Sequence, residues 1–188
     1  MKKLNVINNI KEYLKRYNIY HETCYNNGTF LLTMLFRNCP LSPNELIESC
    51  IWFYDEVMEV RTYYSETASN WIKNNTNKDE NLLDLLNYIN ATVWMNCSDG
   101  VNSNLYKSSM LYCPRIYRTE DGLQDITMTT IIPYDFFFFA EVETKDYITA
   151  FCPEILDKLS PAIFGLVLGE INLEQSKFYV ERLQRGVI

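Results

Sequence analysis

The sequence predicts an α+β fold, in which helices pack against an antiparallel sheet of five to six strands. Some segments repeat apolar residues every three or four positions, as helices do, and others alternate apolar and polar residues, as strands do. Asn-Gly and Asp-Gly turn signals separate pairs of alternating segments, which indicates antiparallel hairpins. The expected order is α-ββββ-α-ββ-α(α), in one domain spanning all 188 residues.

Residues 4–17 are expected to form the first helix, since Leu4, Ile7, Ile10, Leu14 and Tyr17 make one apolar stripe. Two strands, 19–25 and 29–37, follow around the Asn26-Asn27-Gly28 turn. The second of these strands is apolar on both faces. We therefore expect it to be a central strand of the sheet, or one that is covered on both sides.

Residues 46–54 and 57–64 are expected to form a second pair of strands around Asp55-Glu56. Residues 65–78 are polar apart from Trp71, and we interpret them as a connection. A second helix is expected to begin at Asn77, which can form a capping box with Glu80. Its apolar stripe consists of Leu82, Leu85, Leu86, Ile89 and Val93.

A longer hairpin is expected next, with strands 110–117 and 123–132 on either side of Asp121-Gly122. Four phenylalanines follow at 136–139 and cannot all face one side of a helix or a strand. Helical spacing continues from residue 144, but we expect Pro153 and Pro161 to divide it into separate helices. Gly169 is expected to end a helix, and Asn172 with Gln175 to begin the last one.

The charge and composition exclude several classes of partner. A net charge of −7 disfavours binding to nucleic acid and to anionic membranes, because phosphate contacts require a Lys/Arg surface. The apolar run 162–168 is far shorter than the ~20 residues of a membrane span. No apolar stretch of the signal-peptide type follows Met1. We therefore expect a cytoplasmic protein whose six cysteines are reduced.

The residues that carry chemistry do not form a catalytic pattern. The single histidine, His21, lies in the same predicted strand as Cys24, and strand residues three apart point to opposite faces. Acidic pairs occur at Asp55/Glu56 and Glu120/Asp121, where they are typical of solvated turns. Phosphate loops, dinucleotide-binding glycines and metal-ligand spacings do not occur. The sequence therefore predicts a non-enzymatic protein without a cofactor or metal.

Aromatic residues on or beside the predicted strands are the candidate contacts for a protein partner. Tyr and Trp act as binding anchors because they combine a large apolar ring with a polar group, although the same property suits the border of a core. The phenylalanines at 136–139 are expected either to cover the edge of the core or to form a hydrophobic partner site, of the kind that exposed apolar patches mark. The candidates are Trp52, Tyr54, Tyr63, Tyr112, Tyr117, Phe136 and Phe138.

The order of elements resembles the YbjN family, which shares the fold of type III secretion chaperones. The segments that carry the resemblance are the helix at 82–91, the strand at 114–118 before the Asp121-Gly122 turn, and residues 159–170. The resemblance implies a small bacterial protein that binds another protein, in a chaperone-like or regulatory role, and that forms a homodimer. Sheet edges and apolar grooves are surfaces that suit an extended segment of a partner.

Two other functions are compatible with the same sequence. A cytosolic immunity protein that neutralises a basic toxin would also be small and acidic. A small-molecule-binding or enzymatic domain would instead require a deep pocket with converging polar groups.

Overall fold

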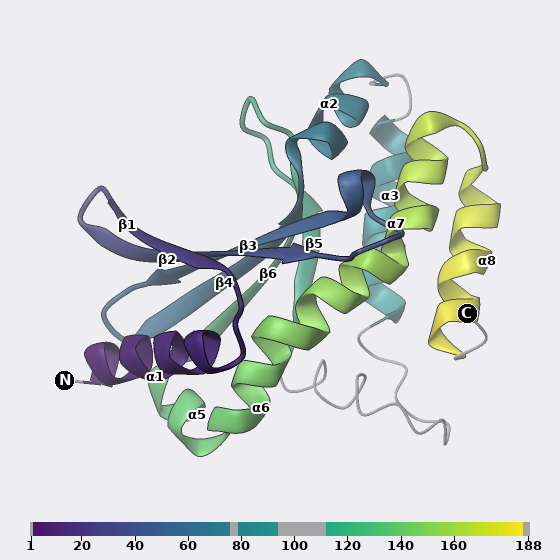
Figure 1. The fold of residues 1–188 in the computed structure, drawn as a ribbon. Coiled ribbons are helices and arrows are strands. Elements are labelled where there is room, and N and C mark those ends of the chain that lie inside the picture. The colour runs from purple at the N-terminus through teal and green to yellow at the C-terminus, as the bar shows by residue number, and fades with distance from the viewer. Residues whose placement is uncertain (1, 76–78, 94–111, 186–188) are drawn as a thin grey trace.

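The computed structural model describes residues 2–75, 79–93 and 112–185, and it confirms the α+β class. One antiparallel sheet of six strands has the order β1-β2-β3-β4-β6-β5 (Figure 1). The strands are β1 (His21–Asn26), β2 (Thr29–Arg37), β3 (Leu46–Phe53), β4 (Val57–Tyr64), β5 (Arg115–Arg118) and β6 (Ile126–Pro133). The helices are α1 (Lys2–Arg16), α2 (Glu66–Asn74), α3 (Asp79–Thr92), α5 (Tyr134–Phe139), α6 (Glu141–Asp146), α7 (Cys152–Leu168) and α8 (Leu173–Gln184). The short 3-10 turn η1 (Pro43–Glu45) precedes β3, and the π-helical turn η3 (Tyr147–Phe151) joins α6 to α7.

The three hairpins expected from the sequence are present. Asn27 and Gly28 connect β1 to β2 with φ angles of 48° and 79°, as a two-residue primed turn requires. β2 lies between β1 and β3, which agrees with its apolar residues on both faces. β5 and β6 form the third hairpin, although β5 is shorter than the strand expected at 110–117.

Helices cover one side of the sheet. Figure 1 shows α1, α5, α6 and α7 together on that side, with α3 and α8 beyond one end of the sheet. The alternating side chains that point toward the helices include Ile51, Val60 and Met128, each almost fully buried. Tyr64 connects the two layers, because its hydroxyl donates to the Leu156 carbonyl of α7 at 2.6 Å. A single hydrophobic cluster therefore spans the sheet and its helical layer.

The expectation of separate helices around Pro161 is wrong, since α7 runs without interruption from Cys152 to Leu168. A proline inside a helix costs about 3 kcal/mol because it removes a hydrogen bond and crowds the preceding turn. Burial of Leu159, Ile163 and Leu166 contributes about 1.5–3 kcal/mol for each side chain, which outweighs that cost. Packing thus holds the helix together across the proline.

The connection expected at 65–78 is also wrong, because residues 66–74 form α2. Its buried Ala68 and Ile72 face the core, and the Trp71 ring meets Phe164 of α7 edge-on at 5.7 Å. The short helix has too few apolar residues for its pattern to stand out in the sequence. The predicted cap at Asn77 and the start of the predicted strand at 110–111 lie outside the described residues.

The predicted helix ends near the C-terminus are confirmed. Gly169 ends α7 in the left-handed conformation, with φ 79°. Asn172 and Gln175 form the capping box of α8, through hydrogen bonds of 2.9 and 3.0 Å. None of the helices in the described ranges has the length and apolar character needed to cross a membrane.

Candidate functional site

The side of the sheet opposite the helices carries the candidate site, which we call the open face. Because side chains alternate along a strand, every second residue of β1–β6 points to this side. Cross-strand pairing aligns Trp52 with Glu59, and Cys50 with Arg61. The open face includes Glu22, Cys24, Leu31, Thr33, Leu35, Glu48, Cys50, Trp52, Tyr54, Glu59, Arg61, Tyr63, Arg115, Tyr117, Thr127, Thr129 and Ile131.

An arginine, Arg61, lies near the middle of the open face and contacts Glu59 and Trp52. Together with Tyr54, which bonds to Glu59, these residues form the Arg61 cluster. Arg61 Nε donates to Glu59 Oε1 at 2.9 Å, and Nη2 donates to Glu59 Oε2 at 3.1 Å. The guanidinium carbon lies 5.3 Å from the centre of the Trp52 ring. Tyr54 donates its hydroxyl to Glu59 Oε2 at 3.0 Å.

This arrangement orients Arg61 while leaving it accessible. The hydrogen bonds that Arg61 donates to the Glu59 carboxylate raise the pKa of Arg61, so the guanidinium stays charged. Its side chain is 38% exposed, whereas that of Glu59 is 13% exposed. The bonds to Glu59 use two of the five guanidinium donors. Arg61 can therefore stack on Trp52 and still donate to a carboxylate or carbonyl of a partner.

A second polar group lies toward the end of the open face. Glu48 and Tyr63 are cross-strand partners, and Asp125, just before β6, is close to both. Burial raises the pKa of the Glu48 carboxyl, and the Asp125 carboxylate raises it further. Burial is likewise the largest cause that raises the pKa of Tyr63. The group therefore combines a half-buried acid with a neutral phenol.

The structure brings together four of the seven aromatic residues that the sequence indicated. Trp52, Tyr54, Tyr63 and Tyr117 all lie on the open face. Tyr54 and Tyr117 are each 38% exposed, and the Tyr117 and Thr129 hydroxyls lie 3.2 Å apart.

The other three predicted residues lie on the helical side. Tyr112 is buried, with its ring stacked 4.0 Å from that of Tyr147. Phe136 is half-buried and meets Tyr112 edge-on at 5.5 Å, so both contribute to the core. Phe138 is 40% exposed on α5, away from the open face.

The sequence interpretation did not select Glu48, Glu59 or Arg61. Counting pairs outward from the Asp55-Glu56 turn would have placed Glu59 opposite Trp52, and Arg61 two residues further along the same face. The signal was therefore present in the predicted hairpin.

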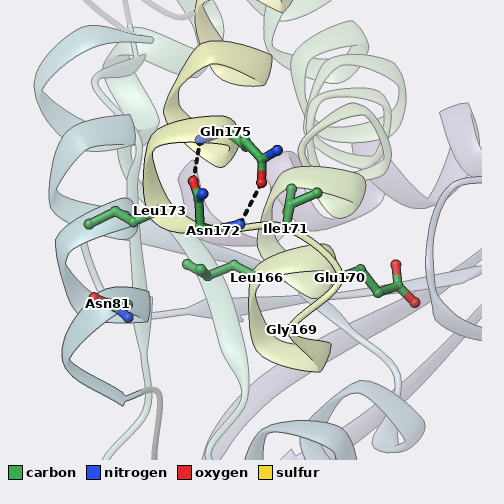
Figure 2. Close-up of a pocket in the computed structure, with 8 residues that line it drawn as sticks. All are labelled: Asn81, Leu166, Gly169, Glu170, Ile171, Asn172, Leu173 and Gln175. Atoms are coloured by element: carbon green, nitrogen blue, oxygen red, sulfur yellow. Dashed lines mark hydrogen bonds between the residues drawn. The ribbon is translucent and has the colours of Figure 1, made fainter.

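A pocket of about 410 Å³ lies apart from the open face, between the end of α7, the start of α8 and Asn81 of α3. Figure 2 shows that Asn172 and Gln175, two of its polar side chains, bond to the backbone of the same capping box. Their side-chain oxygens accept hydrogen bonds from backbone N–H groups at the start of α8. The pocket is therefore explained by the connection between the two helices.

The remaining candidate centres are a metal site and a Cys–His pair. The described residues contain no group of three or more His, Cys, Asp or Glu side chains that could hold a metal ion. His21 and Cys24 lie three apart on β1, so their side chains point to opposite faces. The His21 ring nitrogen Nδ1 lies 2.9 Å from the Ile19 carbonyl.

The fold and this surface define an α+β protein with helices on one side of its sheet and an aromatic, charged surface on the other. Comparison with known protein families, curated proteins and solved structures gives no match.

Proposed function

We propose that this is a non-enzymatic protein-binding domain, chaperone-like or regulatory, whose protein partner binds the open face. The observation that carries this proposal is the gathering of Trp52, Tyr54, Tyr63 and Tyr117 around the partly exposed Arg61. Tyr, Trp and Arg are the residues most enriched at the energetic centres of protein interfaces.

The geometry suits a protein surface better than a small ligand. The four aromatic residues come from β3, the end of that strand, β4 and β5, so they are spread across the sheet. Such a distribution presents a broad area, whereas small ligands bind in concave sites that enclose most of their surface. The resemblance to the YbjN family supports the same class of function, and we propose a cytoplasmic location with it.

Affinity capture with matched variants tests this proposal. Ile131 on the open face and Val142 on α6 are 63% and 64% exposed, so an aspartate at either position leaves the core unchanged. The tagged wild-type protein and the Val142→Asp variant are expected to retain the same partner from native cytosol, and Ile131→Asp to lose it. Equal retention by both variants would show that the partner binds elsewhere.

The captured partner must then be purified and titrated against the same three proteins by calorimetry. Direct binding that is weakened at least tenfold only by Ile131→Asp supports the open face. A toxin whose activity is neutralised by the protein would identify an immunity function. Turnover of a small molecule by the purified chain would contradict the proposal.

A further inference from the structure

The two border strands of the sheet, β5 and β1, differ in how far other parts of the described chain cover their outward backbone groups. At the β5 border, the Asn90 carboxamide of α3 bonds the backbone of Ile116: Nδ2 donates to the carbonyl at 2.7 Å, and Oδ1 accepts from the N–H at 2.9 Å. Arg118 of the same strand pairs with Asp79 of α3 at 2.7 Å. The helix α3 therefore occupies the place that another strand would take.

The β1 border has no comparable cover. The Leu35 N–H donates to the Tyr20 carbonyl, and antiparallel pairing alternates from there. The backbone N–H and C=O groups of His21, Thr23 and Tyr25 therefore point away from β2. No hydrogen bond from the described part of the chain reaches these outward groups.

β1 also lacks the usual protection of a border strand. Such strands are commonly shortened, bulged, or marked by proline and lysine. β1 has six residues with the sequence His-Glu-Thr-Cys-Tyr-Asn, and its one acidic residue is Glu22. Five of the six residues are exposed. The strand therefore offers an unprotected row of hydrogen-bonding groups.

We propose that β1 pairs antiparallel with β1 of a second copy of this chain, about a two-fold axis at Thr23. In this register Thr23 faces Thr23 of the second copy, and His21 faces Tyr25 of the second copy on both sides of the axis. All three outward residues then form reciprocal backbone bonds. The two sheets become one continuous sheet.

Side-chain chemistry selects this register over its neighbours. A shift that centres the axis on Glu22 would place two glutamates opposite each other, which is destabilising. A shift that centres it on Cys24 would pair only Thr23 and Tyr25, leaving His21 without a strand partner. In the proposed register Glu22 faces Cys24 of the second copy, so no like charges oppose.

The strand contact leaves the open face accessible, since pairing at a border adds to the sheet without covering it. Joining the two copies places two open faces side by side. The contact is made by backbone groups at the border of the open face, so it does not depend on the partner proposed for that face.

Cross-linking tests the register directly. Residues 22 and 24 of opposite copies form a non-hydrogen-bonded pair, with Cα atoms about 4.5 Å apart, within the range that a disulfide spans. Glu22→Cys, in a Cys97→Ser/Cys113→Ser background, is treated with diamide, which takes the two electrons released as two thiols form one disulfide. A disulfide-linked dimer is expected on a non-reducing gel, joined through Cys24.

Two controls test whether the disulfide joins residue 22 of one copy to Cys24 of the other. Adding Cys24→Ser to the Glu22→Cys variant is expected to abolish the linked dimer. The background protein without Glu22→Cys is expected to stay unlinked, because Cys24 does not face itself. A linked dimer in that background, or none in the Glu22→Cys variant, would overturn the proposed register.

A second measurement tests the strand pairing without a cross-linking reaction. Thr23→Pro removes the outward N–H at the centre of the contact but no bond to β2, whereas Thr23→Ala keeps that N–H. Sedimentation over a range of concentrations is expected to show dimers for wild type and Thr23→Ala, and at least tenfold weaker association for Thr23→Pro. Equal association of the two variants, with both folded by circular dichroism, would overturn the proposal.

Discussion

Asn90 and Ile116, which are 26 positions apart in the chain, are joined by two hydrogen bonds between one side chain and one backbone unit. The carboxamide presents a donor and an acceptor with the spacing that a neighbouring strand would offer. The border of the sheet at β5 is closed in this way, although no strand of the described ranges lies beyond it.

Asn90→Ala is expected to lower the free energy of unfolding by about 1–3 kcal/mol, because it removes the partner of a backbone N–H and C=O at once. Urea denaturation measures this loss. Asn87→Ala provides the control, since Asn87 lies exposed on the same helix and the helix propensity changes equally. Similar losses for the two variants would mean that the contact with Ile116 adds nothing.

Glu48→Gln is expected to stabilise the protein at neutral pH. Burial and Asp125 raise the pKa of this carboxyl above its ordinary 4.5, so the folded protein resists its ionisation. Stability from Glu48 is therefore complete below pH 4.5 and declines as the pH rises through the folded-state pKa.

The difference between Glu48→Gln and wild type should consequently shrink as the pH is lowered toward the ordinary carboxyl range. Urea denaturation at several pH values measures this, with Glu120→Gln in the exposed turn as the control. A difference that stays constant with pH would rule out ionisation of Glu48 as its cause.

Two buried serines are expected to respond to alanine in opposite directions. The Ser160 hydroxyl is buried without a hydrogen-bond partner among the described residues, whereas Ser176 donates to the Asn172 carbonyl at 3.0 Å. Ser160→Ala should raise the melting temperature, since it removes an unpaired polar group, and Ser176→Ala should lower it. Each change is about 1 kcal/mol. Calorimetry that gave the same sign for both would contradict this assignment.

The cysteines are expected to differ in reactivity. Burial raises the pKa of the Cys152 thiol to about 12, and those of Cys39 and Cys50 to about 11, while Cys24 is exposed. Alkylation at mildly alkaline pH, followed by mass spectrometry of peptides, should therefore modify Cys24 in the folded protein. Cys39, Cys50 and Cys152 should react only when denaturant is added. Rapid labelling of Cys152 under native conditions would mean that the α7 region opens locally, at a free-energy cost far below that of global unfolding.

Part of the candidate site was predictable from local sequence. The Asp55-Glu56 hairpin and its alternation placed Trp52, Tyr54 and Tyr63 near one another. The exclusion of Tyr112 and Phe136 was not predictable, because their burial depends on Tyr147 and other residues of the helical layer. Which side of the sheet the helices cover is a property of the packed chain.

The sequence by itself determined the first four strands, the Asn27-Gly28 turn and the α8 capping box, because each depends on alternation or on contacts within a few residues. Only the tertiary structure decided that α7 continues through Pro161, that α2 is a helix, and that Asn90 closes one border of the sheet. Those outcomes rest on contacts between segments that are distant in the sequence. There, the burial of side chains and the hydrogen bonds of backbone groups outweigh the local preference for a secondary structure. The same long-range packing leaves Arg61 on the open face and β1 at a border where its outward backbone groups have no partner in the described chain.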